Sequence, residues 1–185
     1  SASQVGALTS AQVTALTTAQ AAALTATQAG GLTTAQTAAL ESGDLNKLST
    51  SAFEAIATAV VAGLSNSQVG ALTSSQVTAL TTAQAAQLTS TQSVGITTSQ
   101  TAALETADLS ALTTSAFATI ATGVVAGLSS VQISALTTSQ VEALTTAQAN
   151  ALTAQQARGI TTAQTSALES GDLNKLSTGA FEAIS

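Results

Sequence analysis

The chain has 185 residues and a net charge of −6, and only 6% of its residues are charged. It contains no cysteine, which excludes disulfides and thiolate metal sites. Its only basic residues are Lys47, Arg158 and Lys175, so there is no basic patch for nucleic acid. No apolar run is long enough to predict a membrane span.

An eight-residue pattern runs through the whole sequence. A leucine or isoleucine stands at every eighth position without a gap, from Leu8 to Ile184. In most octads it is followed by Thr-x-x-Gln, as Leu16 is followed by Thr17 and Gln20. This is a capping-box pattern, in which the Thr hydroxyl and the Gln side chain each accept a backbone N–H of the first helical turn. Each such octad therefore predicts the start of a helix.

One continuous helix does not fit this spacing. Eight residues at about 100° each overshoot two turns by about 80°, so the leucines would spiral around the helix. Coiled coils need repeats of seven or eleven residues. The pattern therefore predicts an all-α solenoid, or superhelix, of short capped helices that share one core, because such short helices are unstable alone. We expect leucines inside and Thr, Ser and Gln outside; the alternative is a β-solenoid, because Thr and Val favour strands.

A second period of 64 residues lies over the first. It is marked by three phenylalanines, Phe53, Phe117 and Phe181. There is no linker or break in composition, so the chain reads as one repeat array. The array covers 1–185, with the units 1–64, 65–128 and 129–185.

The residue before each leucine is small almost throughout. It is glycine at Gly31, Gly95 and Gly159. A residue without a side chain allows successive segments to turn and pack closely.

The sequence predicts one departure from the chain of short helices. Ala57 stands where a capping Thr would end the previous helix, and apolar residues around it recur at helical spacing. We therefore expect a longer helix over 52–63, repeated over 116–127 and beginning again near Ala180. This helix should be the most buried segment of each unit.

An acidic variant of the octad occurs once per unit. A glutamate replaces the capping Thr and an aspartate replaces Gln. Carboxylates and backbone oxygens could hold Ca²⁺; the alternative is a solvated bend whose carboxylates are favoured at helix starts. The candidate calcium residues are Glu41, Asp44, Glu105, Asp108, Glu169 and Asp172.

The composition predicts no enzyme and no cofactor. His, Cys and Tyr are absent, so the usual nucleophile–base pairs cannot be built. The residues expected to matter are structural. They are Leu16, Thr17, Gln20, Phe53, Phe117 and Phe181.

Self-association is the expected partnership, either end to end or lateral. The position five residues after each leucine is small at Ala21, Ala29 and Thr37, which suggests a face for lateral contact. A second possibility is a binding module, an adhesin or an ice-binding surface that presents rows of Thr, Ser and Gln.

Two phrases resemble a known kind of repeat. They are LTSAQVTALTTAQ (8–20) and LTTSQVEALTTAQ (136–148). They are similar to octad arrays in very large repetitive bacterial proteins described as adhesin-like, surface-layer-like or haem-utilisation-like. The resemblance implies an extracellular or cell-surface structural protein. Haem ligation would find no His, Met or Tyr in this chain.

Overall fold

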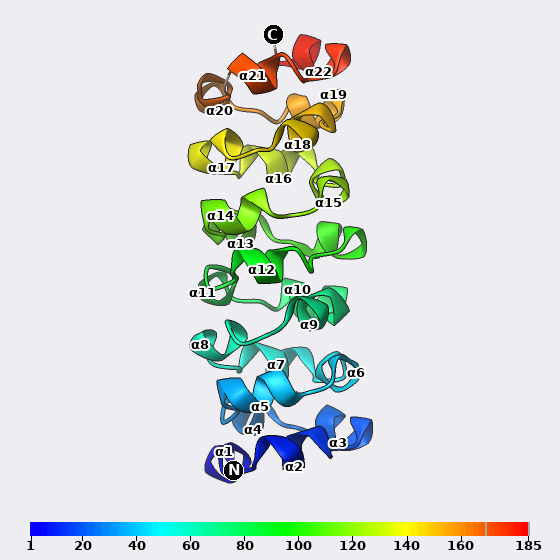
Figure 1. Ribbon diagram of the computed structural model, residues 1–185, viewed down its shortest axis with the longest axis vertical. Helices are drawn as coiled ribbons and strands as arrows, with labels where there is room; N and C mark the ends of the chain where they lie inside the picture. Colours follow the sequence, from blue (N-terminus) through cyan, green and yellow to red (C-terminus); the bar gives the residue numbers. More distant parts are fainter. Residues whose placement is uncertain (169, 185) are drawn as a thin grey trace.

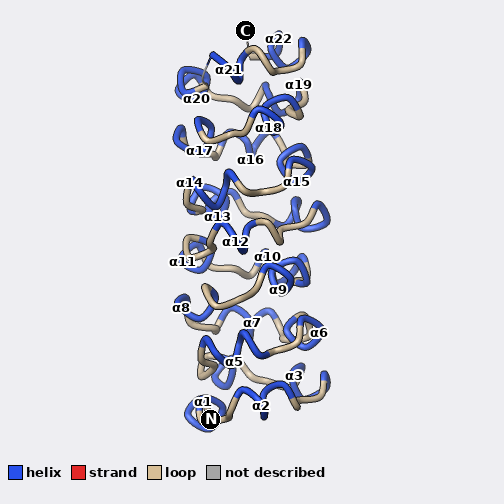
Figure 2. Tube along the Cα trace, in the orientation of Figure 1, coloured by secondary structure: helices blue, strands red, loops and turns tan. Residues whose placement is uncertain are grey.

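The chain forms a long, narrow superhelix with its two termini at opposite ends (Figure 1). The computed structural model describes residues 1–168 and 170–184. Within them it has 22 α-helices and one 3₁₀-helix, joined by short loops and without a strand (Figure 2). The predicted all-α repeat fold is therefore confirmed, and the β-solenoid alternative is wrong.

The helices follow the octads, one in each. Those of the first unit are α1 (Ala2–Gly6), α2 (Ser10–Thr14), α3 (Thr18–Ala22), α4 (Ala26–Ala29), α5 (Thr34–Ala39), α6 (Ser42–Leu45), α7 (Thr50–Glu54) and α8 (Thr58–Val61). Those of the second are α9 (Asn66–Ala71), α10 (Ser74–Thr78), α11 (Thr82–Ala85), α12 (Ser90–Ser93), η1 (Thr98–Ala103), α13 (Thr106–Ala111), α14 (Thr114–Ala118) and α15 (Thr122–Ala126). Those of the third are α16 (Ser130–Ser134), α17 (Thr138–Glu142), α18 (Thr146–Asn150), α19 (Ala154–Ala157), α20 (Thr162–Ala167), α21 (Ser170–Leu173) and α22 (Thr178–Ala183).

Capping boxes start most of these helices, as the octad predicts. At α3 the Gln20 N–H donates to the Thr17 hydroxyl at 3.3 Å, and the Thr17 N–H donates to Gln20 Oε1 at 2.8 Å. The same box opens α2, α11 and α18. Each box satisfies backbone donors that a helix start leaves unpaired.

The predicted longer helix is wrong. In the first unit α7 ends at Glu54 and α8 begins at Thr58, although its N-cap residue, Ala57, has no side chain that could cap it. The reason lies in the next turn of the superhelix. Gln84 Nε2 donates to the backbone carbonyl oxygens of Glu54 and Ile56, at 3.1 and 2.7 Å. These are acceptors that a continued helix would need for itself.

The second unit repeats this break between α14 and α15. There Gln148 Nε2 donates to the carbonyl oxygens of Ala118 and Ile120, at 3.4 and 2.8 Å. In the third unit, α22 begins at Thr178, two residues before the predicted start. A contact between turns therefore ends the helix where local sequence would let it continue.

One hydrophobic core runs along the superhelix. Phe53 and Phe117 are completely buried, whereas Phe181, near the end of the chain, is 51% exposed. Leu16, in the first turn, is half-buried and packs against this core. Ala21, Ala29 and Thr37 are fully buried within the chain, so these positions do not form an exposed face for lateral contact. Self-association itself stays a prediction.

One turn of the superhelix takes three and a half octads. Each helix packs against the third helix before it and the third after it, as α4 packs against α1 and α7. Hydrogen bonds join turns between residues 25 to 31 positions apart. A turn therefore spans about 28 residues.

Glycine is required where two turns cross once per unit. A Cβ atom on Gly31, Gly95 or Gly159 would collide with backbone of the preceding turn. The blocking atoms are the carbonyl oxygens of Ala2, Asn66 and Ser130, respectively. The predicted close packing at these glycines is confirmed.

We expect Gly95→Ala to lower the free energy of unfolding by about 1–3 kcal/mol, because the added methyl group forces the two turns apart. Urea denaturation followed by circular dichroism measures this change. Gly43→Ala in α6 is the matched control, because nothing lies within 4 Å of the position a Cβ would take. Removing a helical glycine should stabilise the fold by up to about 1 kcal/mol. Equal effects at the two sites would contradict the steric explanation.

Candidate functional site

The most distinctive polar feature is a series of buried glutamine side chains, here called the amide ladder. Each stands four residues after an octad leucine and joins its own helix to the preceding turn. The ladder consists of Gln36, Gln68, Gln76, Gln84, Gln92, Gln100, Gln132, Gln140, Gln148, Gln156 and Gln164. All of them are at least nine-tenths buried.

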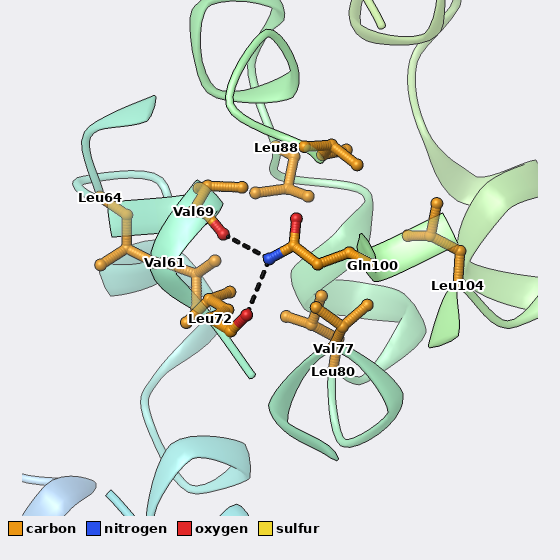
Figure 3. A pocket seen from close by; sticks show the side chains of 10 residues that line it. Val61, Leu64, Val69, Leu72, Val77, Leu80, Leu88, Gln100 and Leu104 are labelled. Atoms are coloured by element: carbon orange, nitrogen blue, oxygen red, sulfur yellow. Dashed lines mark hydrogen bonds between the residues drawn. The ribbon is translucent and has the colours of Figure 1, made fainter. Parts of the chain in front are cut away.

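Gln100 shows how one amide does two things (Figure 3). Its Oε1 accepts the backbone N–H of Thr97 at 2.8 Å. Its Nε2 donates to the backbone carbonyl oxygens of Val69 and Leu72, both at 2.9 Å. The oxygen thus binds the helix start and both hydrogens of the nitrogen bind the turn beneath, so the buried amide is satisfied. An unpaired buried carbonyl would cost about 1–3 kcal/mol.

The same spacing recurs along the ladder. Nε2 reaches a carbonyl oxygen 28 residues earlier and a second one 30 or 31 residues earlier. The prediction that glutamines lie outside is therefore wrong for the ladder, although it holds for exposed glutamines such as Gln20 and Gln87. A glutamine that only caps a helix can remain in solvent. The hydrogen bonds from Nε2 to the preceding turn could not be predicted without knowing how many residues one turn contains.

One signal in the sequence points to this role. A capping box accepts Glu as readily as Gln, yet no octad with the Thr-x-x pattern has Glu four residues after its leucine. Glutamate has no N–H to donate to a carbonyl oxygen. The choice of Gln over Glu therefore marks the contact between turns.

The first turn has the caps without the contact between turns. Gln20 is exposed and keeps its bonds to Thr17. No bond from its Nε2 to another part of the described chain is found. Thr17 and Gln20 therefore act as predicted, but as helix caps only.

Three of the eight ladder positions in a unit are not glutamine. In the first unit they are Asp44, Ala52 and Val60. Alanine and valine side chains cannot donate a hydrogen bond, and Ala52 and Val60 are buried in the hydrophobic core instead. Aspartate replaces the amide by a carboxylate in the equivalent place.

The acidic residues do not gather into one cluster. A 64-residue unit is not a whole number of 28-residue turns, so equivalent residues of successive units point in different directions. Asp44, Asp108 and Asp172 are buried, and Glu41 and Glu105 stand at helix N-caps without a side-chain capping bond. Glu169 lies outside the described residues. Across 1–168 and 170–184, no three acidic side chains come close enough to hold a metal ion.

Asp108 occupies a ladder position with an incomplete set of partners. Its Oδ1 accepts the hydroxyl of Thr82, in the preceding turn, at 2.9 Å. Its Oδ2 is buried and has no hydrogen-bond partner. Burial raises the pKa of the Asp108 carboxyl, the Thr82 hydrogen bond opposes this rise, and the charge of Glu105 adds to it.

The Asp108 pKa gives a pH-dependent stability. In the unfolded chain the carboxyl titrates near 3.8, and in the folded chain it titrates at higher pH. Protonated Asp108 therefore stabilises the fold fully below about pH 3.8, and this stabilisation is lost as pH rises through the folded pKa. We expect Asp108→Gln to unfold at higher urea concentration than wild type at pH 7, with the difference shrinking toward pH 4.

Glu142→Gln is the control for this experiment, because it removes one negative charge from an exposed site. The difference in unfolding urea concentration between Glu142→Gln and wild type should not shrink toward pH 4 as the difference for Asp108→Gln does. A difference between wild type and Asp108→Gln that is constant from pH 4 to 7 would contradict the assignment.

The two roles of the ladder can be separated by one pair of substitutions. Gln20 and Gln84 stand in the same local sequence, Leu-Thr-Thr-Ala-Gln-Ala-Ala, but only Gln84 reaches the preceding turn. We expect Gln84→Met to lower the free energy of unfolding by about 2–4 kcal/mol, because it leaves two carbonyls without a donor. Gln20→Met loses a cap alone and should cost at most about 1 kcal/mol. Urea denaturation of dilute protein tests this, and equal losses would contradict the second role.

The interior offers little room for a ligand. A cavity of about 20 Å³ lies beside Gln100 and is otherwise lined by Val, Leu and Ile side chains (Figure 3). That volume holds about one water molecule. An open groove of about 540 Å³ on the outside passes Thr78, Glu105 and Val131.

The fold and the ladder define the class of protein as an all-α tandem-repeat solenoid. The chain belongs to the ALTTAQ repeat family, whose model matches residues 37–82, 101–146 and 117–154, more than half of the chain. No significant match to a curated protein or to a solved structure was found. Among the described helices, none is long and apolar enough to cross a membrane.

Proposed function

We propose that this chain is a non-enzymatic structural protein, secreted or held at a cell surface, where it forms the rod of a filament, sheath or stalk. The observation that carries the proposal is the amide ladder. The same pair of bonds joins turn to turn from Gln36 to Gln164, around one continuous apolar core. A solenoid built in this way gains length by adding octads, and its stability accumulates between neighbouring turns.

The composition supports a mechanical role over a chemical one. The chain has no His, Cys or Tyr, and its serines have no adjacent base of the kind that activates a nucleophile. The buried polar groups are used to hold the backbone together. The resemblance to repeats of large bacterial surface proteins supports an extracellular location.

Adding a unit tests the mechanical part of the proposal. A second copy of 65–128, inserted after residue 128, preserves the octad register. We expect the rod to lengthen by about a third without loss of stability, as a one-dimensional array should. Small-angle X-ray scattering measures the maximum dimension. Inserting only 65–124 shifts the register by half an octad and should disrupt the fold beyond the junction; tolerance of both insertions alike would contradict a register-locked rod.

Location is tested on cells that make the protein. Gold-labelled antibodies against the chain should decorate the outside of intact, unpermeabilised cells, along rod-shaped or sheet-like structures in electron micrographs. Labelling confined to the cell interior would overturn the extracellular role.

A binding module is the second candidate, favoured by threonines that capping does not use. Thr18, Thr138 and Thr146 each follow a capping Thr, are exposed, and make no side-chain hydrogen bond in the described structure. Such threonines could present hydroxyl and methyl groups to a glycan or to ice. Replacing them together by Ala should abolish binding to that surface and leave the fold unchanged; binding that persists would remove this candidate.

A further inference from the structure

One helix near the middle of the rod differs from its counterparts. It is the 3₁₀-helix η1, whose equivalents in the first and third units, α5 and α20, are α-helices. In α5 the N–H of Thr37 donates to the carbonyl oxygen of Thr33, four residues before it, at 2.9 Å. In η1 the N–H of Gln100 donates to the carbonyl oxygen of Thr97, three residues before it, at 3.0 Å. Bonds with this shorter spacing have poorer geometry, so the second unit holds this helix in a weaker form.

The change of helix type leaves a buried hydroxyl unpaired. In α5 the Thr37 hydroxyl donates to the carbonyl oxygen of Thr33 at 3.0 Å, and in α20 the equivalent hydroxyl, that of Thr165, makes the same bond at 3.1 Å. Thr101 occupies this position in η1 and is buried, but its Oγ1 has no hydrogen-bond partner among the described residues. The carbonyl oxygen of Thr97 accepts the N–H of Gln100 instead, as the 3₁₀ spacing requires.

The helices on either side of η1 carry similar defects. Across the part of the chain that the structure describes, four buried side-chain oxygens lack a hydrogen-bond partner, and three of them belong to Ser93, Thr101 and Asp108. These residues lie in the consecutive helices α12, η1 and α13, within about half a turn of the superhelix. Ser93 stands where the other units have the buried Ala29 and Ala157. Each unpaired buried group lowers the stability of this half-turn.

Packing around η1 is also incomplete. The cavity of about 20 Å³ beside Gln100 is lined by Ile96 and Leu104, which flank η1 in the sequence. The open groove of about 540 Å³ passes along residues 102–106, so solvent reaches the end of the helix. Side chains that line a void lose the contacts they would make with neighbouring atoms. The turns above and below therefore hold η1 less firmly than a filled core would.

We infer that residues 93–108, here called the joint segment, open before the rest of the rod. Helix type, unpaired hydrogen-bonding groups and packing are separate observations, and all three place the weakest structure in the same half-turn. Local opening takes the least free energy where hydrogen bonds are poor and buried contacts are few. If the chain is a structural rod, it would bend or yield first at this segment. That mechanical meaning rests on the proposed function, whereas the difference in local stability does not.

Native-state hydrogen exchange tests the inference within one molecule. Residues 33–40 and 97–104 have the same sequence except that Ala35 is replaced by Ser99, so their amides have similar intrinsic exchange rates. We expect the amides of 101–104 to exchange at least about tenfold faster than those of 37–40, measured by mass spectrometry. Fraying from the ends of the chain predicts the opposite order, because α5 lies nearer to an end. Exchange in 101–104 that is equal or slower would overturn the inference.

A pair of substitutions tests the cause. Thr101→Val removes an unpaired hydroxyl, and we expect it to slow exchange across 97–104 by about three- to tenfold. Thr37→Val is the matched control, because it removes a hydroxyl that is bonded to Thr33, and it should speed exchange across 33–40. Ser93→Ala restores the residue of the other two units and should also slow exchange in the joint segment.

Faster exchange in Thr101→Val, as in Thr37→Val, would show that the Thr101 hydroxyl is bonded in solution and would overturn the assignment of the joint. Circular dichroism checks that each variant remains helical. These measurements depend neither on where the protein is located nor on the insertion of a unit. The joint segment can therefore fail while the structural function stands, and a failed insertion experiment would leave the difference in exchange unaffected.

Discussion

A single glutamine amide is the interaction on which the superhelix depends. Its oxygen receives the N–H that opens a helix, and its nitrogen binds two carbonyl oxygens of the turn beneath. One side-chain amide group therefore couples the start of a helix to the turn of the superhelix beneath it. Because the amide is buried and both of its polar atoms are used, neither Glu nor an apolar residue can replace it without leaving a buried group unpaired.

This coupling explains how helices of four to six residues can persist. A helix of that length is far below the size that is stable in water. Here each one is fixed at its start by a capping box, held by the leucine core, and bound from above by the next turn. The break between α7 and α8 shows that the contact with the next turn can end a helix even without a cap. It occurs at Ala57, where no cap is available, because Gln84 of the next turn binds the carbonyls of Glu54 and Ile56.

The ladder positions that lack glutamine give the rod its second period. In the first two units a buried phenylalanine, Phe53 or Phe117, accompanies the apolar positions. The carboxylate of Asp108 makes a weaker polar contact than the amide it replaces, because its Oδ2 has no hydrogen-bond partner. A 64-residue unit does not divide into 28-residue turns, so these departures are distributed around the rod. The acidic residues of successive units, such as Asp44 and Asp108, are consequently kept apart.

The sequence alone determined the helical class, the octad, the capping boxes and the glycine crossings, because all of these follow from residue spacing and from rules that act within one turn of helix. Residue spacing also placed Phe53 and Phe117 in the core. Only the tertiary structure decided that a turn takes about 28 residues, since that length depends on how leucines and glycines of separate turns pack. The burial of Gln100, the end of α7 at Glu54 and the separation of the acidic pairs all follow from that one length, so they could not be predicted before it was known.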